Sequence, residues 1–176
     1  MNDIILYFSK PSRLIHKIKS EEVKNNTLSI VILFACILVL QNNAGTDSFG
    51  RFNILNAILG VIAALFGTFL SIILKTQLLS WTSKLFTKEH VETNLVRYTI
   101  CYSLIPLILA LVIVHSIPNF KSSTIVYISA LIWSETFVIL MLKGITKTTI
   151  LNNALSVIIS NLILATPAII IGLIIK

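Results

Sequence analysis

Glu135 is the one acidic residue deep within an apolar run, the segment 123–142. An ionised carboxylate at the centre of a bilayer costs about 2.5–3.5 kcal/mol on insertion scales, so this side chain is expected to face other helices. By depth, its expected neighbours carry hydroxyl groups and come from three other runs: Thr68, Ser103, Ser156 and Ser160. Such a group could hold a proton or an ion, or contact a cation of a partner. The alternative is a protonated carboxyl that hydrogen-bonds across helices.

The other residue types that carry catalysis are dispersed along the chain. The three histidines, His16, His90 and His115, fall in different regions, and no two of them have the spacing of metal ligands. The sequence contains no glycine-rich phosphate-binding loop. It also lacks the nucleophile and base, paired aspartates or zinc motif at membrane depth that an intramembrane protease needs. We therefore predict a protein that is not an enzyme and that needs neither a cofactor nor a metal.

Small residues recur at spacings of three and four along the run 52–74, so they share one helix face: Ala57, Gly60, Ala64 and Gly67. Small residues let two helix backbones approach closely. We predict that this face packs against another helix, either of this chain or of a second subunit. In the run 150–175, Ser156 and Ser160 share a face with Asn153, which predicts hydrogen bonds between helices. A substrate path is the alternative.

Apolar runs are the elements that must position these residues. The chain has 176 residues, of which 56% are hydrophobic and only 12% charged, whereas about 25% of the residues in a soluble domain are charged. A chain of this size cannot bury so much apolar surface within itself, so lipid must be part of its solvent. We predict an all-α integral membrane bundle, a single domain 1–176, with five transmembrane helices at about 27–41, 52–74, 98–115, 123–142 and 150–175. The second helix is expected to project beyond the membrane and to turn near Thr87, and Pro106 to kink the third.

Lysine and arginine are concentrated on alternate connections between the runs. Eleven of the 14 lie on one predicted side: Lys10, Arg13, Lys17, Lys19 and Lys24 in the N-terminal tail, Lys75, Lys84, Lys88 and Arg97 in the second connection, and Lys143 and Lys147 in the fourth. Cytoplasmic connections are enriched in these residues. We therefore predict a cell-membrane protein with a cytoplasmic N-terminus and the C-terminus outside.

The charged segment 1–26 is expected to form a short amphipathic helix on the inner membrane face. Pro11 suits a first helical turn, and three apolar side chains share one face, which leaves Lys10, Arg13 and Lys17 to contact lipid headgroups. A solvated basic tail that only sets orientation is the alternative. The net charge of +7 is spread between apolar runs, which argues against a nucleic-acid partner. The predicted partners are the lipid bilayer and another membrane protein or a second copy of the chain.

Two stretches carry a family resemblance. One leads from Leu85-Phe86 through a charged turn to an aromatic-Ser-x-x-Pro pattern at residues 102–106, and the other extends from 131–133 through 142–145 to 153–155. With a short N-terminal segment that contains Lys10-Pro11-Ser12 and five spans after it, this layout resembles the Yip (Ypt/Rab-interacting protein) family of five-span membrane proteins, in its bacterial branch. The sequence departs from the family at 87–90, where a glycine-rich connection is often found.

The resemblance implies a role without catalysis, since no catalytic residues carry over. Eukaryotic members of the family act in vesicle traffic and bind small GTPases, whereas some bacterial members are associated with ABC-type exporters or with protection against membrane-active peptides. We therefore predict a non-enzymatic scaffold or accessory subunit of a membrane complex, linked to one of those two bacterial roles. The alternative is a transporter or channel subunit that moves an ion or small solute through a site that includes Glu135.

Overall fold

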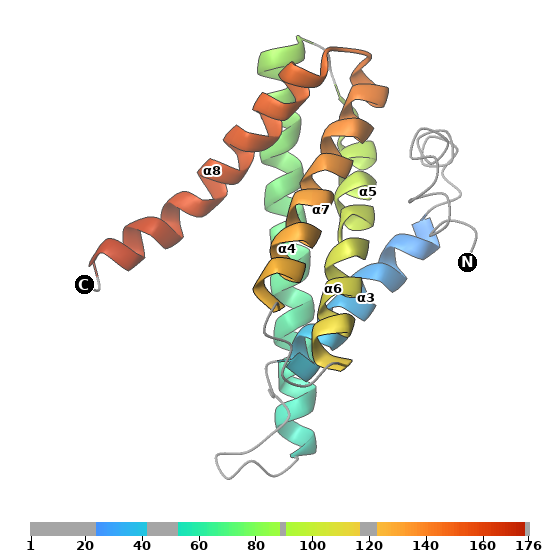
Figure 1. Cartoon of the computed structure of the whole chain (residues 1–176), viewed down its shortest axis with the longest axis vertical. Coiled ribbons are helices and arrows are strands. Elements are labelled where there is room, and N and C mark those ends of the chain that lie inside the picture. Colours follow the sequence, from blue (N-terminus) through green and yellow to red (C-terminus); the bar gives the residue numbers. More distant parts are fainter. Residues whose placement is uncertain (1–23, 42–52, 89–90, 117–122, 175–176) are drawn as a thin grey trace.

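The computed structural model describes residues 24–41, 53–88, 91–116 and 123–174, and this part of the chain is helical apart from short connections. Figure 1 shows its six helices: α3 (Lys24–Gln41), α4 (Ile54–Thr87), α5 (Thr93–Ser103), α6 (Ile105–Ser116), α7 (Ser123–Thr146) and α8 (Ile150–Ile174). Four stretches within it are long and apolar enough to cross a membrane: Ile54–Thr87, Thr93–Ser116, Thr124–Thr146 and Ile150–Pro167. The apolar part of α3, Thr27–Leu40, is shorter. The predicted all-α membrane bundle is confirmed, and the count of five crossings stays a prediction.

The longest helix, α4, continues past residue 74 to Thr87, where the sequence predicted its turn. The side chain of Asn53 caps its start by accepting the N–H groups of Leu55 at 2.9 Å and Asn56 at 3.3 Å. At the end of α4, Lys88 adopts a left-handed conformation (φ 57°), and its backbone N–H donates a hydrogen bond to the carbonyl of Lys84. The 34 residues of α4 are about 51 Å long, which exceeds the roughly 30 Å of a hydrocarbon core.

Pro106 divides the predicted third span into two helices. Proline has no N–H to donate to the carbonyl four residues earlier, so the helical ladder is interrupted there. Leu104 forms a turn whose N–H reaches the carbonyl of Cys101 at 3.2 Å, and α6 resumes with a 2.9 Å bond from Ile108 N–H to the carbonyl of Leu104. The first of the two helices starts at Thr93, one turn before the predicted boundary at 98.

A buried asparagine holds the turn between α7 and α8. Lys147 reverses the chain with φ 54°, and Asn153, which is fully buried, bonds back to the turn. Its amide nitrogen donates to Thr148 Oγ1 at 3.0 Å and to the carbonyl of Thr149 at 2.9 Å, while its Oδ1 accepts the hydroxyl of Thr146 at 3.3 Å. These bonds satisfy backbone and hydroxyl groups that lipid would leave without partners.

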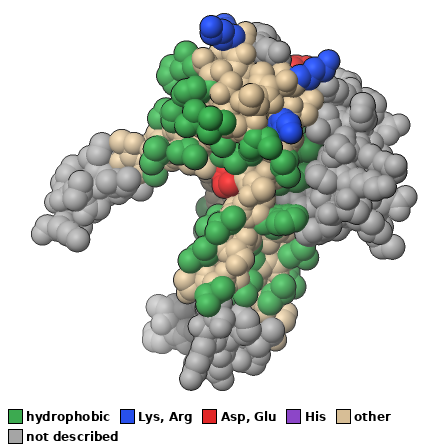
Figure 2. Space-filling model, turned by 45° about the horizontal axis from the view of Figure 1, so that its top comes forward, with side chains coloured by type: hydrophobic (Ala, Val, Ile, Leu, Met, Phe, Trp, Pro, Cys, Tyr) green, Lys and Arg blue, Asp and Glu red, His purple; other side chains and the backbone are tan. Residues whose placement is uncertain are grey.

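The packed core lies toward the end of the bundle at which α4 meets α5 and α7 meets α8 (Figure 1). Its largest cluster joins all the helices except α6 and includes Val31, Leu79, Val96, Val138 and Val157. Five cations belong to the same end of these helices, which we call the basic end: Lys84, Lys88, Arg97, Lys143 and Lys147. On the face drawn in Figure 2, the lysine and arginine side chains in view lie at one end of the molecule. The C-terminal half of α8 departs from the bundle (Figure 1).

A polar seam joins α4 to α8. The hydroxyl of Thr82 lies 2.8 Å from the hydroxyl of Ser160 and donates to the carbonyl of Ser156 at 3.1 Å. All three residues are fully buried. The seam therefore fixes how the first half of α8 lies along α4.

Replacing Thr82 by Val tests the seam. We expect Thr82→Val to lower the free energy of unfolding by roughly 0.6–1.7 kcal/mol, the range measured for hydrogen bonds between membrane helices. Ser160→Ala should cost a similar amount, and the double variant should cost less than the two changes added together. The measurement is unfolding by sodium dodecyl sulfate titration in mixed micelles.

The matched control is Thr136→Val, because within the described part of the chain the exposed Thr136 hydroxyl bonds to the carbonyl of Ile132 on its own helix and to no other helix. This change should leave the unfolding free energy within about 0.5 kcal/mol. Full additivity of Thr82→Val and Ser160→Ala would contradict the seam.

Candidate functional site

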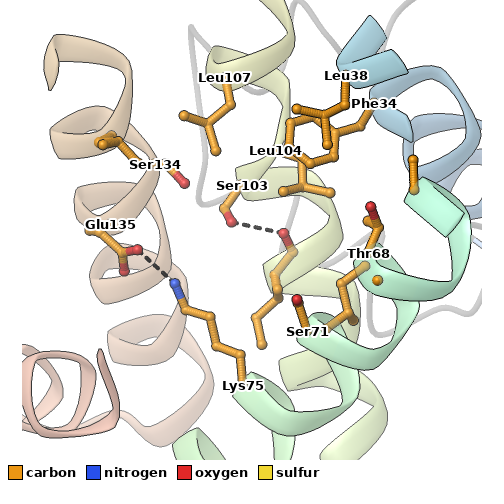
Figure 3. A pocket seen from close by; sticks show the side chains of 15 residues that line it. Phe34, Leu38, Thr68, Ser71, Lys75, Ser103, Leu104, Leu107, Ser134 and Glu135 are labelled. Carbon is orange, nitrogen blue, oxygen red and sulfur yellow. Dashed lines mark hydrogen bonds and ion pairs between the residues drawn. The ribbon is translucent and has the colours of Figure 1, made fainter. Parts of the chain in front are cut away.

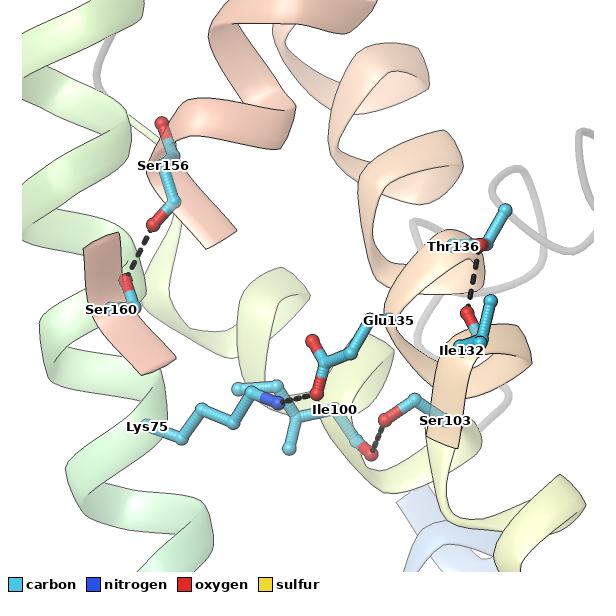
Figure 4. Close-up of polar contacts among 8 residues, drawn as sticks. All are labelled: Lys75, Ile100, Ser103, Ile132, Glu135, Thr136, Ser156 and Ser160. Carbon is cyan, nitrogen blue, oxygen red and sulfur yellow. Dashed lines mark hydrogen bonds and ion pairs between the residues drawn. The ribbon is translucent and has the colours of Figure 1, made fainter. Parts of the chain in front are cut away.

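An ion pair links the middle of α4 to the middle of α7. Lys75 Nζ lies 2.6 Å from Glu135 Oε1 (Figure 4). The Lys75 side chain is 17% exposed and that of Glu135 30% exposed. A lone charge at membrane depth is unfavourable, and an opposite charge within hydrogen-bonding distance offsets much of that cost.

Lys75 is the partner that sequence reasoning missed. The sequence pattern predicts that Lys75 belongs to the second connection, whereas the structure places it inside α4, twelve residues before the helix ends. The reason is that α4 continues past 74 as a helix, so a charge at that position remains beside α7 instead of entering a loop. The available signal was a lysine and a glutamate, each embedded in an apolar run, that could neutralise each other.

A cavity of about 460 Å³ lies beside the ion pair, between α3, α4, α5, α6 and α7. Figure 3 shows its polar side chains from α4, α5 and α7, and its apolar wall of Phe34, Leu38, Leu104 and Leu107. The hydroxyl-bearing residues that line it are Thr68, Ser71, Ser103 and Ser134. Apolar walls with a few converging polar groups are typical of ligand sites between helices.

The predicted neighbours of Glu135 divide between two places. Thr68 and Ser103 line the same cavity as Glu135, and the Ser103 hydroxyl donates to the carbonyl of Ile100 at 2.8 Å. Ser156 and Ser160 do not line this cavity and instead form the seam with Thr82. Figure 4 shows the Ser160 hydroxyl bonded to the carbonyl of Ser156, away from Glu135. Both serines belong to α8. This helix contacts α4 at Thr82, which lies closer to the basic end than Lys75.

Glu135 retains an acceptor that the described residues leave unused. Its Oε2 is buried and has no hydrogen-bond partner within the described part of the chain. Oε1 is engaged by Lys75. An unpartnered carboxylate oxygen in an apolar setting is unfavourable. A hydrogen-bond donor that enters the cavity would therefore be stabilised by bonding to Oε2.

The small-residue face of α4 lies partly beside this cavity. Ala64 and Gly67 line it, and a Cβ atom added at Gly67 would meet nothing within 4 Å. Ala57 lines a separate hollow on the α4 surface with Val61 and two isoleucines, and Gly60 is half-buried. Close packing of another described helix is therefore absent at Gly67. The predicted headgroup contacts Lys10, Arg13 and Lys17 lie outside the described residues.

A comparison with protein families now identifies the chain. The family model described as the Yip1 domain matches residues 5–173. The chain belongs to the Yip1 domain family. A comparison with curated proteins and one with solved structures each find no match. The predicted family is thus confirmed, and placement in its bacterial branch stays a prediction.

In this Yip1 domain protein the ion pair should contribute to stability as a unit. We expect Lys75→Met and Glu135→Met each to lower the free energy of unfolding by roughly 2–3 kcal/mol, because each leaves one charge unpaired at membrane depth. The double variant should regain most of that loss, since an apolar pair removes both charges together. In a Cys36→Ser background, thermal unfolding can be followed through the buried Cys101 thiol with a thiol-reactive dye.

Lys84→Met is the matched control, because Lys84 is an exposed cation of the same helix. It should change the unfolding free energy by less than about 0.5 kcal/mol. If the losses from the two single variants simply add in the double variant, the pair does not stabilise the bundle.

Proposed function

We propose that this Yip1 domain protein is a non-enzymatic scaffold or accessory subunit that holds another integral membrane protein against α4. The observation that carries the proposal is the openness of α4. Only 11% of its most apolar stretch is buried within the described chain, compared with 61% for the stretch formed by α5 and α6. Phe66, Ile62 and Ile58 are all more than half exposed on it, and Ala57 lines a hollow on the α4 surface with Ile58 and Ile62, where a small residue would let a second helix approach closely.

The finer proposal concerns the partner. The resemblance to bacterial family members supports an ABC-type exporter as the partner, or a role in protection against membrane-active peptides. We further propose that the protein lies in the cell membrane and that its single domain has five spans. Its N-terminus would be cytoplasmic and its C-terminus outside. The grouping of Lys84, Lys88, Arg97, Lys143 and Lys147 at the basic end supports that orientation.

The ion pair at Glu135 favours a structural role over a path for ions. Lys75 already neutralises Glu135. From this level toward the basic end, the core is closed by tightly buried apolar side chains, namely Leu79, Val96, Val138 and Leu142. A transporter or channel subunit remains the second candidate, and the cavity beside Glu135 is the observation that favours it.

Site-specific photocrosslinking in the native membrane tests the scaffold. We expect a photoreactive residue at Phe66 or Ile62 to capture one defined integral membrane protein, recovered in equal amount with the chain. The same residue at Leu162, which is 59% exposed on α8, is the control and should capture mainly lipid. Identical capture from both helices would contradict a docking face on α4.

The second candidate makes a different prediction for the same protein. If purified chain in liposomes conducts an ion or solute, and the folded Lys75→Met/Glu135→Met variant abolishes that flux, the scaffold is the wrong function. A scaffold without transport should retain its crosslinked partner in this variant, because the paired residues lie in the cavity and not on the exposed α4 face.

Labelling of single cysteines tests the orientation. We expect Ser116→Cys, at the opposite end from the cations, to react with a membrane-impermeant thiol reagent in intact cells. Asn94→Cys, exposed at the basic end, should react only after the cells are permeabilised. Replacement of Cys36 and Cys101 by Ser provides the background, and the reverse labelling pattern would overturn the predicted orientation.

A further inference from the structure

A second, smaller cavity lies between α3, α4 and α5, on the other side of Ile72 from the ion pair. Its volume is about 230 Å³. Leu28, Phe69 and Ile73 line it and are each at least 41% exposed, so its mouth is apolar and faces outward from the bundle. Its floor is formed by buried Val31, Ile72 and Cys101.

Two residues give this crevice a polar edge. Arg97 and Tyr98 both line it, and Arg97 is exposed. The described part of the chain contains two acidic residues, Glu92 and Glu135, and its ion pair joins Glu135 to Lys75. Arg97 therefore carries a charge that no described carboxylate neutralises, beside a membrane-facing apolar wall.

An arginine over an apolar crevice selects a particular chemistry. The planar guanidinium donates several N–H bonds in a fork that matches phosphate oxygens. The walls below it suit a hydrocarbon chain, which buries apolar surface without needing hydrogen bonds. Basic pockets between membrane helices are known binding places for anionic lipid headgroups.

We propose that this crevice binds an anionic phospholipid, with its phosphate on Arg97 and one acyl chain between Leu28, Phe69 and Ile73. Tyr98 offers a further hydrogen-bond donor at the same edge. The crevice lies on the same side of α4 as Ile62 and Phe66 but farther toward the basic end, and α3 and α5 form its other walls. The lipid proposal does not depend on the proposed function. An anionic headgroup suits this edge better than a zwitterionic one, because the choline or ethanolamine cation would add a second positive charge beside Arg97, which no described carboxylate neutralises.

Native mass spectrometry of the full chain, released from nanodiscs of equal phosphatidylglycerol and phosphatidylcholine, tests the proposal. We expect one phosphatidylglycerol to be retained preferentially. Arg97→Gln should reduce that retention about fivefold, the change expected for one cation near lipid headgroups. The control is Lys143→Gln, which removes an exposed cation of the basic end that does not line the crevice.

Leu28→Trp provides a second variant that keeps the arginine and fills the mouth of the crevice. Because Leu28 is 51% exposed, the larger side chain can be accommodated without unfolding the bundle. We expect this variant also to lose the retained lipid. Unchanged melting temperatures for Arg97→Gln and Leu28→Trp would show that both variants remain folded.

Three outcomes would overturn the site. Equal retention of phosphatidylglycerol by wild type and Arg97→Gln would show that Arg97 does not bind the lipid. Equal retention of phosphatidylcholine would show ordinary lipid contact. Displacement of the lipid by inorganic phosphate at millimolar concentration, with Leu28→Trp behaving as wild type, would assign the crevice to a free anion instead of a lipid.

Discussion

A hydrocarbon solvent offers no hydrogen bonds, so each polar group that enters it has to find its partner within the protein. This constraint organises the bundle around α4. Lys75 meets Glu135 of α7, and Thr82 meets Ser160 of α8, two turns further along the same helix. One wall of α4 is thereby committed to its neighbours. The opposite wall carries Ile58, Ile62 and Phe66, which the described chain leaves more than half exposed.

The break at Pro106 shapes the other half of the molecule. Because α5 and α6 are separate helices, the segment Thr93–Ser116 can follow the centre of the bundle and is its most buried membrane stretch. The ion-pair cavity and the crevice beside Arg97 both border α5. Ile72 of α4 lines each of them, so this side chain forms part of the wall between the two.

These features divide the membrane-facing surface by chemistry. The open face of α4 near Ile62 and Phe66 is apolar, whereas the crevice between α3, α4 and α5 combines an apolar wall with Arg97, whose charge no described carboxylate neutralises. These are the two surfaces on which the proposed protein partner and the proposed lipid would bind. The ion pair lies on the other side of α4 and joins this helix to α7.

The sequence by itself determined the all-α membrane class, the approximate helices, the turn near Thr87 and the interruption at Pro106. Each of these follows from local composition, the helical period or the missing N–H of proline. It also identified Glu135 as a residue needing a partner and placed Thr68 and Ser103 near it. Only the tertiary structure decided that the partner is Lys75, that Ser156 and Ser160 serve α8 instead, and that Gly67 faces open space. The physical reason is that linear position gives depth along one helix, whereas contact depends on how far each helix extends, how it tilts and which face it turns to its neighbour.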